Sequence, residues 1–427
     1  MQRHDSTPSR FKLTLIASLG TLLEWAEYTF YGYMALILAK LFFPADNAFI
    51  SLMKTFGIFA SGYFMRPVGA YFFGKIGDLK SRTTALFYAM MLMGICGLGI
   101  GLLPTYETIG IFAPLLLLFF RLLQGISVGG EYNGAGIFLT EQFGQEHRCL
   151  SGSFTSMAAA FGMVLGGLGA YCVMLPGMPE WAWRVPFLFG SLTAFLGLWL
   201  RRSFLSPHLT RQSLTPKIAP LTLPFFLKKY AGNLATVFSI AALTGVFVYV
   251  NNIYFVVFLT KKVGLLVHEA TLVAILGETL VALFIPVFAW YADKTSPIKL
   301  YQFGLMMVVI FTPSVFWLAQ QGSLSFLLAS QLVFALLNAL ISAPLVYMMV
   351  HLFPSEIRYR SISIAYSLGA ALFGGTAPMV AQYLQTQYDW LWGTLYTPSL
   401  YVCFFALVTY FVVKSNLCKI NHFQHPG

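Results

Sequence analysis

The chain has 427 residues, of which 58% are hydrophobic and only 10% are charged. A soluble protein carries roughly 25% charged residues, so the composition excludes an ordinary soluble domain and indicates a protein that crosses a membrane many times. The net charge of +11 would suit a nucleic-acid-binding protein, but the basic residues lie between apolar segments, which favours a role in membrane orientation. The five cysteines are scattered and show no spacing typical of a zinc site or redox pair.

Twelve apolar segments are long enough to cross a membrane, which takes about 20 mainly apolar residues. The predicted helices are 13–41, 53–76, 84–104, 108–135, 151–175, 184–203, 230–259, 269–291, 300–319, 324–351, 361–384 and 393–413. A polar, proline-containing stretch separates the first six from the last six. The sequence therefore predicts an all-α membrane protein with an N-terminal six-helix bundle (1–200), a linker (201–229) and a C-terminal six-helix bundle (230–427).

Most of the 26 lysine and arginine residues fall at the ends of the chain, in the linker and in alternate connections. Because cytoplasmic segments of membrane proteins are enriched in these residues, both termini are predicted to lie in the cytoplasm and the protein in the inner membrane. The basic N-terminal tail has no small-residue cleavage site, so a removable signal peptide is not expected.

Ionisable residues inside the predicted spans cost about 2.5–3.5 kcal/mol each on insertion scales and mark candidate functional sites. Glu24 and Glu27 share one face of the first helix with Tyr28 and Tyr31, because residues three or four apart are neighbours on a helix. Arg121 lies at a similar depth in the fourth helix. Two acids facing one base leave one carboxylate able to carry a proton. A permanent ion pair that only fixes packing is the alternative.

Burial and like charge both favour protonation of one of the two acids, and Arg121 opposes this for the acid that it contacts. We expect Glu27 to carry the proton and Glu24 to be the ionised partner of Arg121, although the reverse assignment also fits. A substrate carboxylate engaging Arg121 would release that acid to bind a proton, which predicts symport. Glu278, alone among apolar residues in the eighth helix, is the next candidate; it either hydrogen-bonds in its protonated form or lines water.

Neutral polar residues at membrane depth are further candidates for substrate binding. They are Gln124 in the fourth helix, Asn251 and Asn252 in the seventh and Asn338 in the tenth. Such groups often only hold helices together, and that alternative stays open. The glycine-rich runs lack the preceding strand and following Gly-Lys-Ser/Thr of a phosphate-binding loop, so neither ATP nor any other cofactor is implied.

The stretch GYFMRPVGAYFFGKIGDLKSR (62–82) ends in a short charged connection between two predicted helices. Glycines 62, 69, 74 and 77 fall on or near one helical stripe, which predicts close helix packing. A weaker copy, PVFAWYADKTSPIKL (286–300), stands in the second half, and two such loops indicate two similar halves. We expect a network of charges to close the molecule at this face. Its predicted members are Arg66, Asp78, Arg82, Glu131, Asp293 and Arg358.

The 62–82 stretch resembles the loop signature of the major facilitator superfamily. LLEWAEYTFYGY (22–33), FRLLQGISVGGEYNGA (120–135) and FPSEIRYRSISIAYSLGAALFGGTAP (353–378) are similar to its metabolite:proton symporter branch, which includes carriers of proline/betaine, citrate, 2-oxoglutarate and shikimate. The resemblance implies two bundles around a central cavity lined by helices one, four, seven and ten. The chain departs from the pattern at Glu27, where the family has aspartate, and in DKTSP (293–297), which lacks the arginine cluster expected to latch the second half.

These features together predict a secondary active transporter that moves a small carboxylate-bearing metabolite, an organic acid or a zwitterion, together with protons. The protein is expected to act as a monomer within the lipid bilayer. An enzyme is not expected, because the sequence shows no nucleophile–base constellation or metal cluster. The alternative function is a transporter-like sensor that binds a metabolite without net flux, which the reduced second loop would favour.

Overall fold

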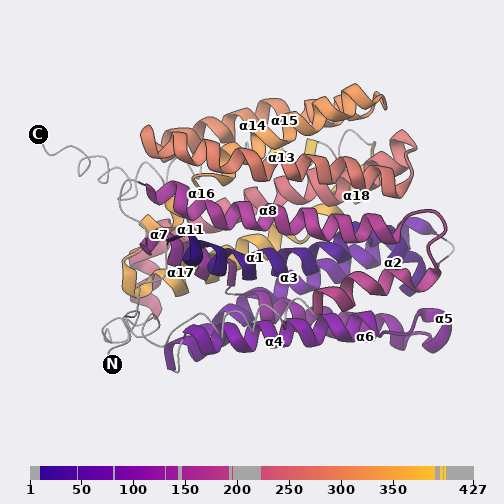
Figure 1. Ribbon diagram of the computed structural model, residues 1–427, viewed down its shortest axis with the longest axis horizontal. Helices are drawn as coiled ribbons and strands as arrows, with labels where there is room; N and C mark the ends of the chain where they lie inside the picture. The colour runs from indigo at the N-terminus through magenta and orange to yellow at the C-terminus, as the bar shows by residue number, and fades with distance from the viewer. Residues whose placement is uncertain are drawn as a thin grey trace, which may run out of the picture.

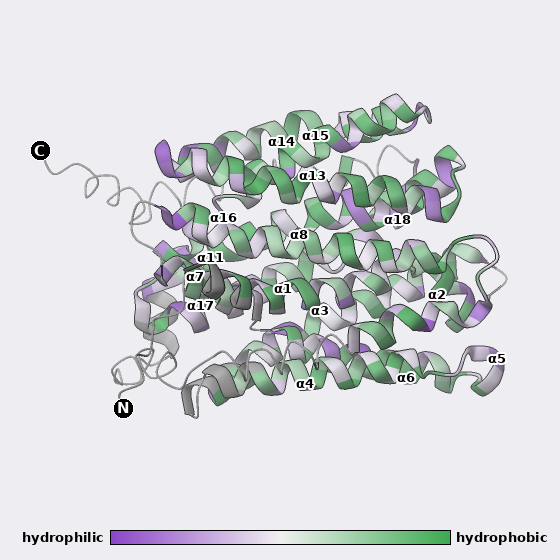
Figure 2. Cartoon of the chain, in the orientation of Figure 1, coloured by the Kyte–Doolittle hydropathy of each residue, from purple (hydrophilic) through white to green (hydrophobic). Residues whose placement is uncertain are grey.

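The computed structural model describes residues 10–45, 47–79, 82–129, 131–142, 147–191, 195, 223–389, 395–397 and 399–400. Within these ranges all regular secondary structure is helical, and eight helices are long and apolar enough to cross a membrane. Hydrophobic residues run along the length of the helices, whereas many of the hydrophilic ones gather at the two ends of the molecule (Figure 2). This distribution is the one that a bilayer imposes on spanning helices.

The first half of the chain supplies the helices drawn from indigo to magenta in Figure 1. They are α1 (Arg10–Tyr33), α2 (Ala35–Phe42), α3 (Ala48–Leu79), α4 (Arg82–Gly101), α5 (Tyr106–Ile109), α6 (Phe112–Val128), α7 (Glu131–Gln142), α8 (Arg148–Val173) and the 3₁₀ turn η2 (Glu180–Trp183). The first predicted span appears as α1 and α2, and the fourth as α6 and α7. The fourth span also extends beyond its predicted end at 135, to Gln142.

The second half contains α11 (Leu223–Tyr249), η3 (Val250–Tyr254), α12 (Phe255–Phe258), η4 (Leu259–Val263), α13 (Val267–Lys294), α14 (Pro297–Ala319), α15 (Leu324–Ser342), α16 (Leu345–His351), α17 (Ser355–Gly369), η5 (Ala370–Gly374) and α18 (Ala377–Gln387). The segments η3, η4 and η5 are π-helical turns, which interrupt long helices most often at functional sites. Most of the predicted linker, and most of the sixth and twelfth predicted spans, lie outside the described residues.

Glycines let α3 and α6 pack backbone against backbone, as the glycine stripe predicts. A Cβ atom on Gly69 would lie 1.9 Å from the carbonyl oxygen of Ile126, and one on Gly125 would lie 1.9 Å from that of Gly62. Side chains at these positions would therefore force the helices apart. The close approach fixes the register between Arg66 on α3 and Arg121 on α6.

The two halves meet along several helix pairs, among them α8 with α13 and α3 with α17. In Figure 1, α4 and α6 lie at the bottom, α14 and α15 at the top, and α1, α3, α8 and α13 between them. We name the two ends of the molecule after residues at each. The Arg148 end holds Glu141, Arg148, Asp293 and Arg358. The Gly110 end holds the connections 43–45, 102–111, 174–179, 264–266 and 320–323.

Candidate functional site

Arg121 lies fully buried on α6 with its guanidinium against aromatic rings. The guanidinium carbon is 4.3 Å from the ring centre of Tyr28 and 4.4 Å from that of Tyr31. Its Nη1 donates a hydrogen bond of 2.6 Å to Oε1 of Gln124. The two remaining donor atoms, Nε and Nη2, are buried without a hydrogen-bond partner in the described part of the chain. These two atoms form one edge of the planar guanidinium.

Gln124 stands between Arg121 and Glu27. Its Nε2 donates to Oε2 of Glu27 at 3.5 Å, so one carboxamide connects the base to the acid. The Glu27 carboxylate reaches α4, where it lies against Gly97, and it also contacts Gly190. Glu27 therefore points into the N-terminal bundle. Glu24 was the predicted partner of Arg121, whereas the structure connects Glu27 to Arg121 through Gln124.

A small cavity adjoins both acids within the N-terminal bundle. It is lined by Gly20, Leu23, Glu24, Glu27, Ala89, Met90, Met93, Ser127, Val128 and Gly190. Two carboxyl groups at one cavity make it suited to water or a proton. Its walls come from α1, α4, α6 and the segment at 190, so it lies beside the Arg121 cluster and away from the second half.

Arg66 belongs to the same central cluster. Its guanidinium carbon lies 3.9 Å from the ring centre of Tyr63 and 4.6 Å from that of Tyr28. Tyr28 thus carries one guanidinium near its ring from each of two helices, which is the cation–π arrangement that aromatic rings offer to cations. Arg66 is one of the predicted gating residues, and the structure buries it beside Tyr63. The Tyr63 hydroxyl donates to that of Tyr249 in the second half.

Asn251 and Asn252 of the seventh span lie on the π-helical turn η3, and both are fully buried. Asn251 donates to the backbone carbonyl of Phe247 over 2.8 Å, which leaves its Oδ1 without a partner among the described residues. Asn252 donates to Oε1 of Glu278 over 2.5 Å and accepts from the hydroxyl of Tyr33. The extra residue in a π-helical turn widens the helix and lets adjacent polar residues reach different partners.

Asn338 on α15 makes a local contact instead. Its Oδ1 accepts from Ser342 one turn later over 2.8 Å, and the residue is buried. This use of the carboxamide oxygen agrees with the alternative that Asn338 holds its helix in place. The structure does not connect it to Arg121 or Glu278 by a described hydrogen bond.

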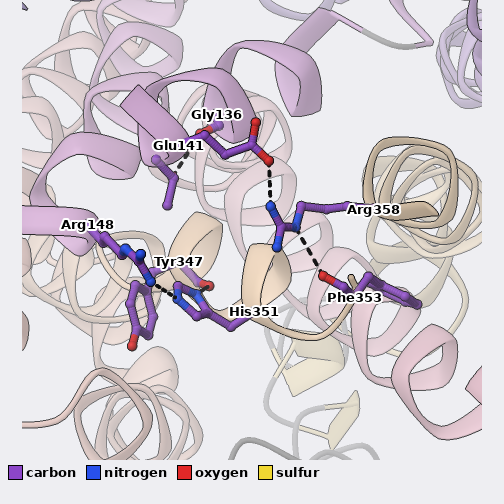
Figure 3. Close-up of polar contacts among 8 residues, drawn as sticks. Gly136, Glu141, Arg148, Tyr347, His351, Phe353 and Arg358 are labelled. Atoms are coloured by element: carbon purple, nitrogen blue, oxygen red, sulfur yellow. Dashed lines mark hydrogen bonds and ion pairs between the residues drawn. The ribbon is translucent and has the colours of Figure 1, made fainter. Parts of the chain in front are cut away.

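Charged residues close the Arg148 end between the halves (Figure 3). Arg358 on α17 forms an ion pair of 2.5 Å with Glu141 on α7 and also donates to the carbonyl of Phe353. Arg148 on α8 contacts Nε2 of His351 at 3.2 Å. Because Nδ1 of His351 faces the carbonyl of Tyr347 at 2.8 Å, that nitrogen carries the proton and Nε2 accepts from Arg148.

Asp293 makes a further cross-half contact at this end. Its two carboxylate oxygens accept hydrogen bonds of 2.8 Å each from the backbone N–H groups of Cys149 and Leu150, in the first turn of α8. A carboxylate in this position satisfies orphan donors and complements the positive end of the helix dipole. The second loop lacks the arginine cluster, but Asp293, one of the predicted gating residues, contacts the other half through this helix terminus.

The remaining gating candidates, Asp78, Arg82 and Glu131, have side chains outside the described residues. Sequence reasoning missed three members of the Arg148 end, namely Glu141, Arg148 and His351. The available signal was their position beside predicted helix ends, but nothing in the sequence pairs Glu141 with a residue in the other half.

The family model for the "Sugar (and other) transporter" family matches residues 13–207. A putative proline/betaine transporter of Staphylococcus aureus (strain COL) is 30% identical over 413 residues, which cover 94% of this chain and 87% of that protein. The proline/betaine transporter of Escherichia coli K12 is 28% identical, over 87% of this chain and 77% of that protein. The inner membrane metabolite transport protein YhjE of the same organism is 29% identical, over 91% and 90%.

Among solved structures, the xylose transporter XylE from E. coli in a partially occluded inward-open conformation matches with a TM-score of 0.70 at 20% identity, covering 95% of this chain and 97% of that one. XylE is described as a proton:xylose symporter of the major facilitator superfamily, and this likeness shows the shared fold. The likeness to XylE confirms the predicted fold class, and the bacterial relatives confirm the prediction of a transporter rather than an enzyme. The chain is a multi-pass membrane transporter that belongs to the major facilitator superfamily, in the metabolite:proton symporter branch that contains the proline/betaine transporters.

Proposed function

We propose that this protein carries a small carboxylate-bearing metabolite, an organic acid or a zwitterion, across the inner membrane by alternating access and with proton symport. In this proposal the Arg148 end and both termini lie in the cytoplasm, the halves are 1–200 and 230–427, and a monomer is the working unit. Proline and betaine, the substrates in the names of the bacterial relatives, both carry a carboxylate.

One observation carries the proposal for the substrate. The Nε–Nη2 edge of Arg121 is buried and has no hydrogen-bond partner among the described residues. A carboxylate accepts two parallel hydrogen bonds from such an edge, and charge-assisted bonds of this kind are about twice as strong as neutral ones. The rings of Tyr28 and Tyr31 hold the guanidinium in a fixed plane, so little orientation remains to be lost on binding.

The contact between Arg121 and Gln124 supports proton coupling at Glu27. Gln124 takes one donor of Arg121 and gives one to Glu27. A substrate carboxylate on the free edge of Arg121 would compensate its positive charge, and Glu27 would then gain affinity for a proton. Substrate and proton would bind together, and neutralisation of both charges would favour passage through a dry closed state. The sensor alternative rested on the reduced second loop, and Asp293 weakens that reason because it contacts α8 across the halves.

Uptake into proteoliposomes tests the proposal with labelled betaine, proline, citrate, 2-oxoglutarate and xylose, each with and without an inward proton gradient. We expect accumulation of at least one carboxylate-bearing compound that depends on the gradient. Arg121→Lys should lower its uptake at least tenfold, because an ammonium cannot reproduce the planar two-bond grip.

Arg184→Lys is the matched control. Arg184 donates to the carbonyl of Leu103 at the Gly110 end, over 2.9 Å and outside the Arg121 cluster, so its replacement should leave uptake within about twofold. Transport of xylose alone, or carboxylate uptake that survives Arg121→Lys unchanged, would contradict the proposal.

A further inference from the structure

A buried chain of hydrogen bonds joins the two halves through Tyr33, Asn252 and Glu278. The Tyr33 hydroxyl, at the end of α1, donates to Oδ1 of Asn252, and Nδ2 of Asn252 donates to Glu278 on α13 over 2.5 Å. The exposed fractions of the three residues are 1%, 0% and 1%. A single polar path therefore runs from the first half, through the π-helical turn of the second half, to a carboxyl group sealed from water.

This chain of hydrogen bonds is separate from the hydrogen bonds at Arg121. The Arg121–Gln124–Glu27 contacts lie inside the first half and share no residue with it. Each chain ends at a buried carboxyl group met by one carboxamide. The difference is in compensating charge: Arg121 acts on Glu27, whereas no Lys, Arg or His nitrogen in the described part of the chain lies within ion-pair distance of Glu278.

The helices around α13 also bring little charge to Glu278. Tyr33 of α1 is the titratable group that faces it. The residues of α15 next to this part of α13 are Gln331 and Phe334, and neither α15 nor α12 carries a titratable residue. The titratable residues of the other neighbours and of α13 itself lie toward the helix ends. They are Lys261 and Lys262 on η4, Arg148, Cys149, Tyr171 and Cys172 on α8, His268, Glu269, Tyr291, Asp293 and Lys294 on α13, and Lys299 and Tyr301 on α14.

An ionised carboxylate in such a position is costly. Removing one from water costs several kcal/mol even after the protein relaxes, and one neutral amide does not compensate this. A protonated carboxyl avoids the cost and keeps a carbonyl oxygen that accepts the bond from Asn252. The three hydrogen-bonded residues can therefore keep their contacts without water when the Glu278 carboxyl carries a proton. Parting of α1 from η3 would break the bond from Tyr33 and bring water to the carboxylate.

We propose that Glu278 is a second proton-binding site, and that Asn252 and Tyr33 couple its protonation to closure of the Gly110 end. Protonation of Glu278 favours closure of the Gly110 end, and closure raises the proton affinity of Glu278. Because the two equilibria are linked, each changes the equilibrium constant of the other by the same factor. The proposal goes beyond the transport reaction at Arg121 and rests on the proposed function only for the existence of alternating access.

The test uses a cysteine at Ile253, next to Asn252. Ile253 is buried against Gly32 of α1, so Ile253→Cys should react with a water-soluble maleimide only when α1 and η3 part. The protein is reconstituted without substrate, and its native cysteines are replaced. The labelling rate of the cysteine at 253 is divided by the rate of the same cysteine in the unfolded protein at the same pH. We expect this ratio of labelling rates to rise about tenfold between pH 5 and pH 9.

Glu278→Gln mimics the protonated acid, so its ratio should stay at the low-pH value throughout. Glu278→Asp keeps a titratable carboxyl and should retain the rise, which guards against a folding defect. Tyr33→Phe should raise the ratio about threefold at every pH because the bond to Asn252 is lost. A rise that persists in Glu278→Gln, or its absence in the parent chain, would overturn the proposal. No transport is measured, so the outcome is independent of the metabolite proposed above.

Discussion

At the scale of single residues, the central feature is that Gln124 mediates between Arg121 and Glu27. The carboxamide has one acceptor and two donors, and it offers the acceptor to the base and a donor to the acid. The two charged groups therefore influence each other without direct contact. An acid held in this way can gain or lose a proton without the collapse of a direct ion pair.

Glu27→Gln should abolish accumulation of substrate on a proton gradient and spare the exchange of labelled for unlabelled substrate. The neutral side chain fits the same space between Gly97 and Gly190 but cannot carry a proton. Proteoliposome uptake and exchange, measured on the same preparation, provide both readouts. Glu24→Gln is the companion variant: if it loses accumulation while Glu27→Gln retains it, Glu24 is the coupling acid and our assignment is reversed.

The sequence predicted much at this scale and failed where contacts join distant segments. Helical spacing placed Glu24, Glu27, Tyr28 and Tyr31 together, and membrane depth selected Arg121 as their partner. Arg66 was predicted to join the charged network at the end of its helix, but α3 extends to Leu79, so this arginine lies well inside the helix. The bond between Asn252 and Glu278 could not be foreseen, because a π-helical turn changes which face a residue occupies.

At the scale of helices, packing of α3 on α6 depends on residues that lack side chains. Gly69→Ala would place a methyl group 1.9 Å from a backbone carbonyl. Backbone cannot move as a flexible side chain can, and overpacking costs typically about 1–3 kcal/mol. We expect the thermal unfolding temperature in detergent to fall by several degrees.

Gly57→Ala on the same helix is the control, because its Cβ would meet no atom within 4 Å. It should leave the unfolding temperature unchanged or raise it slightly, since alanine favours a helix over glycine by about 1 kcal/mol. Equal losses in the two variants would show that glycine content, rather than close approach, determines stability here.

The N-terminus of α8 gives a second prediction at this scale. Asp293→Asn keeps one acceptor oxygen but replaces the other by a donor that faces the N–H groups of Cys149 and Leu150. The free energy that keeps the Arg148 end closed should then fall by about 0.5–2 kcal/mol. We expect transport to slow several-fold, while equilibrium binding of substrate changes little.

Lys294→Gln is the neighbouring control for Asp293→Asn. Lys294 lies 3.7 Å from the ring centre of Trp290 on its own helix, so its loss should not affect closure between the halves. Scintillation proximity binding and vesicle uptake separate the two quantities. Parallel loss of binding and uptake in Asp293→Asn would assign Asp293 to the substrate site.

At the scale of the whole molecule, the halves contact each other at both ends. The Arg148 end is closed by Glu141–Arg358 and by Asp293. Toward the Gly110 end, Thr271 lies 3.9 Å from the sulfur of Met174, and Tyr171 faces His268. A transporter that works by alternating access must break one set of contacts while it keeps the other. The two sets therefore stabilise opposite conformations, and weakening one set shifts the equilibrium toward the conformation that the other set stabilises.

The native Cys149 reports on this balance, because it is buried at the Arg148 end against the carbonyl of Ala343. Glu141→Gln removes an ion pair that is partly exposed, so Cys149 alkylation should rise only about two- to fivefold. Tyr33→Phe weakens the other end and should lower it. A change in the same direction in both variants would mean that the ends do not oppose each other.

The burial of the seventh span has a consequence for how the protein is made. The helical segment Lys229–Val263 is apolar enough to cross a bilayer, yet 89% of the residues in its most apolar 18-residue window are buried within the protein. We therefore expect this segment to enter the bilayer before the later helices are made, and Asn251 and Asn252 to be enclosed by protein only once those helices pack around it. Its hydrophobicity therefore serves insertion, whereas its small and polar residues serve assembly. Maturation of the chain should consequently be limited by the arrival of the last spans, and truncation after residue 320 should leave this segment accessible to lipid-soluble labels.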